Sequence, residues 1–166
     1  MTRSNSLQSV ALVSLTALAT TFLIQACGGS DATAQSASDA DPIEGVWDFT
    51  VTRKDCASGA VLGTQKALSQ FHRGGTFSND NSTPPATHGA MFGTWKRGSG
   101  SAYAIGMVFM RFNPDGTLAG TQKVQRSDVV AADGNSISGS VAAQTLDTAG
   151  VVTLQGCASE TAVRVF

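Results

Sequence analysis

The chain has 166 residues and a net charge of −1, and only 14% of its residues are charged. Because it has no cluster of Lys or Arg, its charge gives no argument for nucleic-acid binding. Glycine occurs 18 times and proline 4 times, a balance that is typical of short strands and tight turns rather than of disorder.

The first 26 residues have the three parts of a secretory signal peptide. Arg3 supplies the positive n-region, residues 10–24 form the apolar h-region, and Ala26 is the small residue before the cleavage site. An uncleaved membrane anchor is the alternative. The apolar run is short for that role, because a transmembrane helix needs roughly 20 predominantly apolar residues. We therefore predict that residues 1–26 are removed.

The signal peptide ends in a sequence that resembles the lipobox of bacterial lipoproteins, Leu23-Ile24-Gln25-Ala26-Cys27. In those proteins a signal peptidase cuts before the cysteine and a lipid is attached to it. The resemblance implies a lipid on Cys27 and anchoring to a membrane of the cell envelope. The next residue is Gly28 rather than Asp. In lipoproteins of the Gram-negative type this implies the outer membrane, at its periplasmic face.

The segment after Cys27 contains no large apolar residue up to residue 41. Such a segment cannot bury enough surface to offset the entropy of ordering it. We therefore predict a flexible tether in this segment, with a reach on the order of 20 Å. The predicted organisation is a signal peptide over 1–26, a lipidated Cys and disordered tether over 27–41, and one domain over 42–166.

Two further cysteines lie in the predicted domain, Cys56 and Cys157. In an oxidising envelope two remaining cysteines usually pair. The alternative is a reactive or metal-binding thiol. The chain contains no CxxC motif, and neither His72 nor His88 has metal-ligand spacing from a cysteine. We predict a disulfide between Cys56 and Cys157, no metal and no cofactor.

Alternation of apolar and polar residues recurs from Gly45 onward, interrupted by turn sequences such as Asn113-Pro114-Asp115-Gly116. The pattern predicts eight strands, at about 45–54, 65–72, 75–80, 93–96, 102–112, 117–130, 136–147 and 151–165. Eight successive antiparallel strands favour an all-β, up-and-down barrel, which removes free strand edges by closure. If the closing strands place Cys56 opposite Cys157, then Trp47 faces Phe166 and Phe49 faces Arg164.

The first and last strands carry a pattern similar to that of the lipocalins and the wider calycin group, namely Gly45-Val46-Trp47 and Arg164. In that group a GxW tryptophan packs at the closed barrel end beneath an arginine from the final strand. The resemblance implies a lipocalin-like barrel in which Trp47 packs against Arg164. Later segments, such as Gly93-Thr94-Trp95, look like small bacterial barrel proteins of uncharacterised function.

The interior of an eight-stranded barrel is either filled by side chains or holds one small ligand. Small residues occupy several predicted inward positions, which favours a cavity: Ala67, Ser69, Gly120, Gly139 and Ala143. The alternative is a tight barrel filled by larger side chains: Trp47, Phe49, Val51, Phe71 and Phe112.

Three polar residues are candidate ligand contacts, Arg53, Gln122 and Arg126. We predict that they point inward, where an arginine fork suits an anionic head group. The alternative places these arginines in solvent at the barrel rims. We expect His72 and His88 to be exposed, and no nucleophile–base pair or close carboxylate pair can be identified. The sequence therefore favours a protein without enzymatic activity and assigns no catalytic residue.

Strand 102–112 is apolar on both faces. Its outer face is either covered by the loop 78–90 or exposed as a patch for a protein partner. The same loop is a candidate lid over one barrel mouth.

Three functional hypotheses follow from these observations. The first is a membrane-anchored barrel that binds a small apolar or amphipathic ligand in the cell envelope. The second is a structural or interaction lipoprotein with a filled barrel. The third is a cyclase- or isomerase-like barrel enzyme, because similar barrels such as allene oxide cyclase carry out chemistry. It requires a buried polar cluster, for which Arg126 and Gln122 are the hints.

Overall fold

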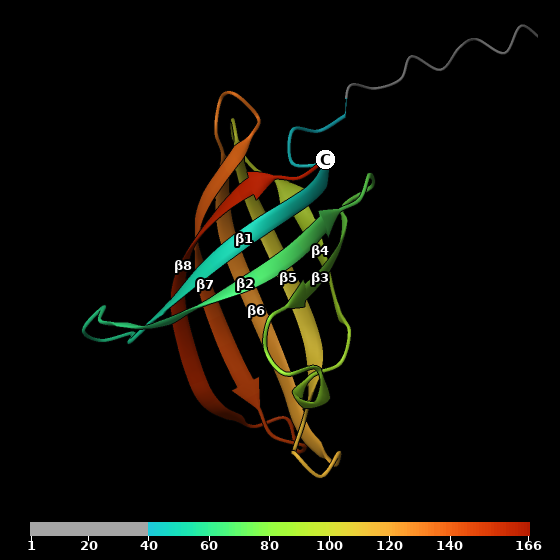
Figure 1. The fold of residues 1–166 in the computed structure, drawn as a ribbon, viewed down its shortest axis with the longest axis vertical. Coiled ribbons are helices and arrows are strands. Elements are labelled where there is room, and N and C mark those ends of the chain that lie inside the picture. Colours follow the sequence, from blue (N-terminus) through green and yellow to red (C-terminus); the bar gives the residue numbers. More distant parts are fainter. Residues whose placement is uncertain (1–39) are drawn as a thin grey trace, which may run out of the picture. The chain divides into compact units, whose positions relative to one another are not determined.

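A computed structural model describes residues 40–166, so the predicted signal peptide, Cys27 and nearly all of the predicted tether lie outside the described residues. Eight antiparallel strands form a closed barrel in which each strand pairs with the next and the last pairs with the first (Figure 1). The strands are β1 (Gly45–Lys54), β2 (Val61–Phe71), β3 (Thr76–Asn81), β4 (Met91–Arg97), β5 (Ala102–Phe112), β6 (Leu118–Val130), β7 (Ser136–Leu146) and β8 (Val152–Arg164). The predicted all-β, eight-stranded up-and-down barrel is confirmed.

The only helix within residues 40–166 is a single 3-10 turn, η1 (Pro85–Thr87), between β3 and β4. None of the described residues forms a helix that is long and apolar enough to cross a membrane.

The strand boundaries differ most from the predicted ones in β2, which begins at Val61 rather than near residue 65. Its first residues are exposed, so they show no alternation of apolar and polar residues. They extend the pairing with β1 as far as Lys54 opposite Val61, across a β-bulge after Arg53. A protruding hairpin of this kind gives no periodic sequence signal.

The predicted register of β1 against β8 is wrong by two residues. Trp47 lies opposite Arg164 rather than Phe166, and Phe49 lies opposite Ala162 rather than Arg164. The cause is the position of Cys56, which lies beyond the end of β1 in the turn that follows. Because side chains alternate with a period of two, the shift leaves each side chain on its predicted face.

The predicted disulfide is confirmed. Cys56 and Cys157 are joined by an S–S bond, with their Cα atoms 5.2 Å apart and a sequence separation of 101. Since β8 closes onto β1 near these residues, the bond fastens the closing seam of the barrel at one end.

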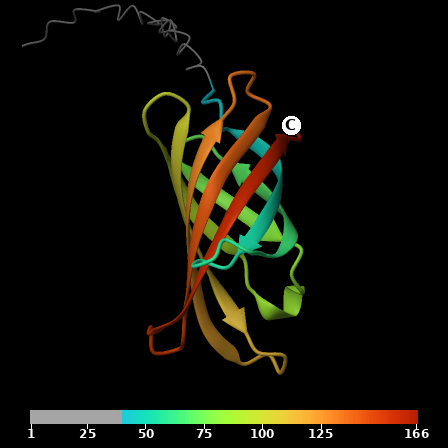
Figure 2. The same ribbon diagram turned by 90° about the vertical axis from the view of Figure 1, so that its left-hand side faces the viewer.

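The interior is packed in the half of the barrel where β1 begins and β8 ends. This half holds an aromatic core in which the rings of Phe71 and Phe77 lie 4.7 Å apart. Trp95 packs edge-on against Phe71 and against Tyr103. The chain enters and leaves the barrel at this closed end, while the β5–β6 and β7–β8 hairpins extend to the opposite end (Figures 1 and 2). We call that opposite end the mouth.

Candidate functional site

The mouth half of the barrel encloses a cavity of about 860 Å³. Small-molecule sites in proteins have volumes of roughly 300–1,000 Å³, so the cavity is large enough for one ligand. Its walls include mainly apolar side chains from four strands: Val51, Met107, Phe109, Val124, Val141 and Ala143. Exposed residues such as Asn113 and Leu154 also line it, so it opens to solvent at the mouth. The predicted cavity and the predicted filled core each describe one half of the barrel.

The closed end is built around Trp47 and Arg164. The Arg164 guanidinium lies 4.2 Å from the centre of the Trp47 ring. Its Nε donates to the carbonyl of Gly134 at 2.8 Å and its Nη1 to that of Glu44 at 2.8 Å. Trp47 Nε1 donates to the carbonyl of Ile43 at 2.8 Å. These bonds satisfy the polar groups of both side chains at the end of the barrel where the core is packed.

A buried charged cluster separates the packed core from the cavity. Arg126 Nε donates to Glu160 Oε1 at 2.6 Å, and its Nη2 donates to Asp128 Oδ2 at 3.2 Å. Its Nη1 lies 3.5 Å from Ser69 Oγ, and the guanidinium stacks on Phe49 at 4.0 Å from the ring centre. We call Arg126, Asp128 and Glu160 the floor cluster, because Arg126 and Glu160 line the inner end of the cavity.

Burial, joined by the hydrogen bond and the charge of Asp128, raises the pKa of Glu160 to about 8 against the attraction of Arg126. With both carboxylates ionised, the buried cluster would carry a net charge of −1. One proton makes it neutral. Asp128 Oδ1 is buried without a hydrogen-bond partner among the described residues. A protonated Glu160 would carry a hydrogen-bond donor for the Asp128 carboxylate.

Gly139 makes room for the floor cluster. It lies on β7 between Asp128 of β6 and Glu160 of β8. A Cβ at this position would lie 2.0 Å from Asp128 Oδ1 and 2.7 Å from the Ser127 carbonyl oxygen. The small size of the Gly139 residue favoured a cavity when only the sequence was considered. The space that it leaves is instead filled by the Asp128 carboxylate.

The three predicted ligand contacts, Arg53, Gln122 and Arg126, all line the cavity. They occupy different levels. Arg53 is exposed at the mouth, Gln122 is half-buried in the wall, and Arg126 is buried at the inner end. Because the guanidinium of Arg126 is directed at protein partners, it is not free to hold an anionic head group.

The sequence analysis missed Asp128 and Glu160. A signal for Asp128 was present in the sequence. It lies two residues after Arg126 and six after Gln122, so alternation places all three side chains on the inward face of β6. Glu160 gave a weaker signal, because it is one acidic residue among small residues on β8. Only the closed barrel brings it to Arg126, 34 residues away in the sequence.

His88 and His72 are half-buried, so the expectation that they are exposed is wrong. His88 lines the cavity mouth, its ring lies edge-on to Phe109, and its Nδ1 lies 3.1 Å from the Gly89 carbonyl oxygen. Its Nε2 is buried without a hydrogen-bond partner among the described residues. His72 Nε2 lies 3.1 Å from Ser78 Oγ. His88 is partly buried because it forms a β-bridge with Arg111 near the end of β5.

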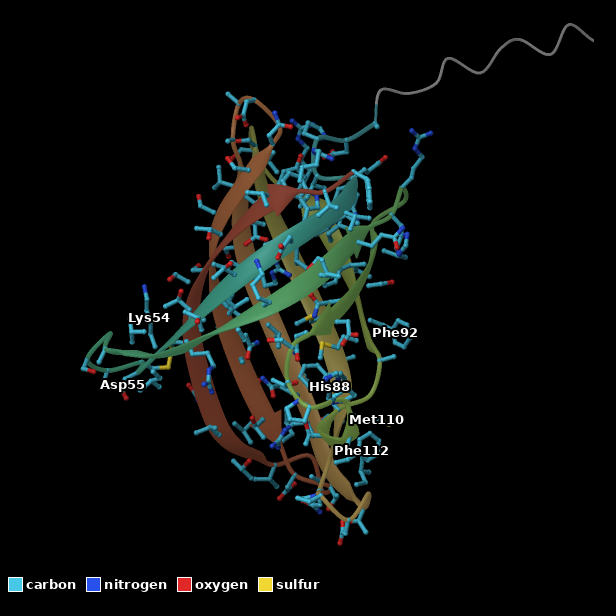
Figure 3. All side chains as sticks on the ribbon, viewed as in Figure 1. Lys54, Asp55, His88, Phe92, Met110 and Phe112 are labelled. Atoms are coloured by element: carbon cyan, nitrogen blue, oxygen red, sulfur yellow. A yellow bond between two sulfur atoms is a disulfide. The ribbon has the colours of Figure 1, made fainter. Side chains whose placement is uncertain are left out.

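The β3–β4 loop lies at the mouth, where Thr83 and Thr87 line the cavity beside His88. The side chains of Val108 and Met110 on the outer face of β5 are exposed, so the loop leaves this face largely uncovered. Phe112 lies beside Met110 on the same side of the barrel (Figure 3), where a Cβ at Gly89 of the β3–β4 loop would be 3.6 Å from its ring. The β-bulge at this point places the extra residue on β6, so the alternation of β5 continues to Phe112.

No protein-family model matches this chain, and no curated protein or solved structure matches it. The relation to lipocalins therefore stays a prediction. Within residues 40–166 no group of three or more His, Cys, Asp or Glu side chains is placed to hold a metal ion.

Proposed function

We propose that this protein is a lipid-anchored barrel of the cell envelope that binds one small amphipathic molecule in its cavity. The observation that carries the proposal is the cavity of about 860 Å³, closed at one end by the floor cluster and the aromatic core and open at the other. Apolar walls with a few polar groups are the usual composition of small-molecule sites.

The distribution of polar groups favours one orientation of the ligand. Basic residues outnumber acidic ones in the outer part of the cavity lining, which includes Arg53, Lys54 and Arg111 with Asp55. Of these, Lys54 and Asp55 lie at the β1–β2 hairpin (Figure 3). The charged groups of the floor cluster are hydrogen-bonded to one another, and the cluster is neutral when it holds one proton. The apolar body of the ligand therefore lies against Met107, Phe109 and the other wall residues. Its polar or anionic head stays at the mouth.

Anchoring through Cys27 is part of the proposal and rests on the lipobox resemblance. The first described residues are held at the closed end of the barrel. Asp41 Oδ1 accepts a hydrogen bond from the Tyr103 hydroxyl at 2.5 Å, and the carbonyl of Pro42 accepts one from Arg164, both at the closed end. The tether thus joins the barrel at the end opposite the mouth.

Ligand binding is tested with protein purified from its native membrane. Mass spectrometry of the organic extract identifies the molecule that copurifies. In the Ala143→Phe variant a large ring fills part of the cavity, and we expect at least a tenfold loss of that molecule. Ala142→Phe is the matched control, because Ala142 is the exposed neighbour of Ala143 on the outer face of β7. Equal recovery from both variants would contradict the proposal.

Anchoring is tested separately with Cys27→Ser. We expect incorporation of labelled fatty acid into the wild-type chain and none into the variant, which would move to the soluble fraction after export. A variant that stays labelled would show that Cys27 is not the lipidation site.

A second candidate function, acid–base chemistry on the bound molecule, is favoured by one observation. The Glu160 carboxyl lines the cavity, and its raised pKa of about 8 keeps it protonated near neutral pH, as a general acid requires. Comparing the molecules extracted from wild type and Glu160→Gln separates the two functions. Pure binding predicts the same molecule from both, whereas catalysis predicts that the variant retains a different molecule, the unconverted substrate.

A further inference from the structure

One outer surface of the barrel combines exposed apolar side chains with basic ones. Phe92 on β4 is 63% exposed, and Val108 and Met110 on β5 are 45% and 57% exposed. Lys96 on β4 and Lys123 on β6 are also exposed. We call these five residues the β4–β6 face.

The strand register places three members of this face, Phe92, Val108 and Lys123, side by side. Phe92 lies directly opposite Val108, and Val108 lies directly opposite Lys123. Met110 follows on the same face of β5, and Phe92 and Met110 project from the same side of the barrel in Figure 3. The apolar residues therefore form one group with a lysine beside it.

The charge of this face differs from that of the rest of the chain. Strands β4, β5 and β6 contain a single carboxylate, Asp128, and its side chain is buried in the floor cluster. The β4–β6 face thus carries two lysines and no acidic residue, whereas the whole chain has a net charge of −1. On the outer side of β1 and β2, by contrast, Lys66 is paired with Asp48 at 2.5 Å.

We propose that the β4–β6 face docks on an anionic lipid bilayer. Aromatic and aliphatic side chains enter the headgroup region, and lysines beside them bind lipid phosphates. A protein partner fits the face less well. Three apolar side chains are few for an interface of about 800 Å² per partner, and a closed barrel offers no free strand edge for pairing. The inference requires neither the ligand nor the lipid on Cys27.

Binding is measured by flotation of residues 40–166 with lipid vesicles. All strand pairs, the core and the disulfide lie within these residues, so the domain is self-contained. We expect binding to phosphatidylglycerol-containing vesicles that weakens with salt, and little binding to pure phosphatidylcholine. Lys96→Gln and Lys123→Gln should each weaken binding about fivefold, and Phe92→Ser about tenfold. The matched controls Lys66→Gln and Val163→Ser should bind like wild type.

A fluorescent label reports which face contacts the lipid. Because Cys56 and Cys157 are bonded to each other, Met110→Cys provides the single free thiol in residues 40–166 for an environment-sensitive dye. Val163→Cys is the control, because Val163 is 58% exposed on β8. We expect the dye at residue 110 to brighten with anionic vesicles and the dye at residue 163 to stay unchanged.

Three results would overturn the proposal: no binding to anionic vesicles, binding that the face variants do not weaken, or equal brightening at residues 110 and 163. A concentration-dependent dimer that Phe92→Ser abolishes, without vesicle binding, would assign the face to a second copy of the chain instead. Loss of the cavity ligand in Ala143→Phe has no bearing on these measurements, so the two proposals fail independently.

Discussion

The guanidinium of Arg164 lies over the ring of Trp47 and joins three parts of the chain at the closed end of the barrel. It donates hydrogen bonds to carbonyls of the segment before β1, at Pro42 and Glu44, and to the carbonyl of Gly134 in the β6–β7 turn. A planar group with several donors in fixed directions is needed for this, and lysine does not provide one.

Arg164→Lys should therefore destabilise the domain although it keeps the charge. We expect a loss of about 2–3 kcal/mol in the free energy of unfolding, because the part-buried carbonyls of Glu44 and Gly134 lose charged donors. Urea denaturation followed by tryptophan fluorescence measures the loss. Arg73→Lys is the control, since Arg73 is largely exposed in its ion pair with Glu44 and should change stability by less than about 0.5 kcal/mol. Equal stability of the two variants would show that Arg164 contributes charge alone.

The number and order of the strands could be predicted because each buried strand has one face inside and one outside. Alternation predicted the bounds of β1, whose inward residues, such as Trp47, are apolar. The bounds of β5 were predicted from its apolar run, which ends at the turn Asn113-Pro114-Asp115-Gly116. The protruding start of β2 is exposed and showed no such pattern. The closing register was wrong because a disulfide limits the distance between two residues without requiring them to be direct cross-strand partners.

The candidate site was predictable only in part. Inward alternation placed Arg53, Gln122 and Arg126 at the cavity lining. It did not reveal that Arg126 is held by Glu160, because that contact depends on the tilt of strands across the barrel. Nor does alternation show where the filled core stops and the cavity begins, which depends on side-chain volumes at each level.

Gly139→Ala should disrupt the floor cluster. The added methyl group would overlap Asp128 Oδ1, so the carboxylate must move away from Arg126. We expect a loss of about 1–3 kcal/mol in the free energy of unfolding, measured by urea denaturation. Gly106→Ala is the control, because nothing lies within 4 Å of the Cβ position there. If Gly139→Ala and Gly106→Ala were equally stable, the Asp128 carboxylate would not occupy this space.

The stability of the domain should depend on pH through Glu160. Its pKa of about 8 in the folded state lies above the ordinary value of 4.5, so between pH 4.5 and 8 the folded state holds a proton that the unfolded state has lost. Stability from this proton is present in full below pH 4.5 and is lost as the pH rises to 8. The loss is about 1.4 kcal/mol per pH unit at most.

Glu160→Gln tests this expectation, because the amide stays neutral at every pH. Denaturation midpoints between pH 5 and 8.5 should fall with pH for wild type and fall less steeply for Glu160→Gln. Parallel curves for the two proteins would show that Glu160 is not the group that titrates.

Removing the disulfide should weaken the mouth more than the closed end. The bond between Cys56 and Cys157 closes a long loop, so the double variant Cys56→Ala/Cys157→Ala should lose about 2–4 kcal/mol in the free energy of unfolding. Wild type in reductant should approach the same value, and the double variant should not respond to reductant. Trp47 and Trp95 lie in the packed core away from the bond, so their native fluorescence should persist in the folded double variant. Faster hydrogen exchange should be confined to the mouth ends of β1 and β8, because the bond holds the closing seam together there. An equal increase in the exchange rate at Trp47 and Arg164 would contradict this expectation.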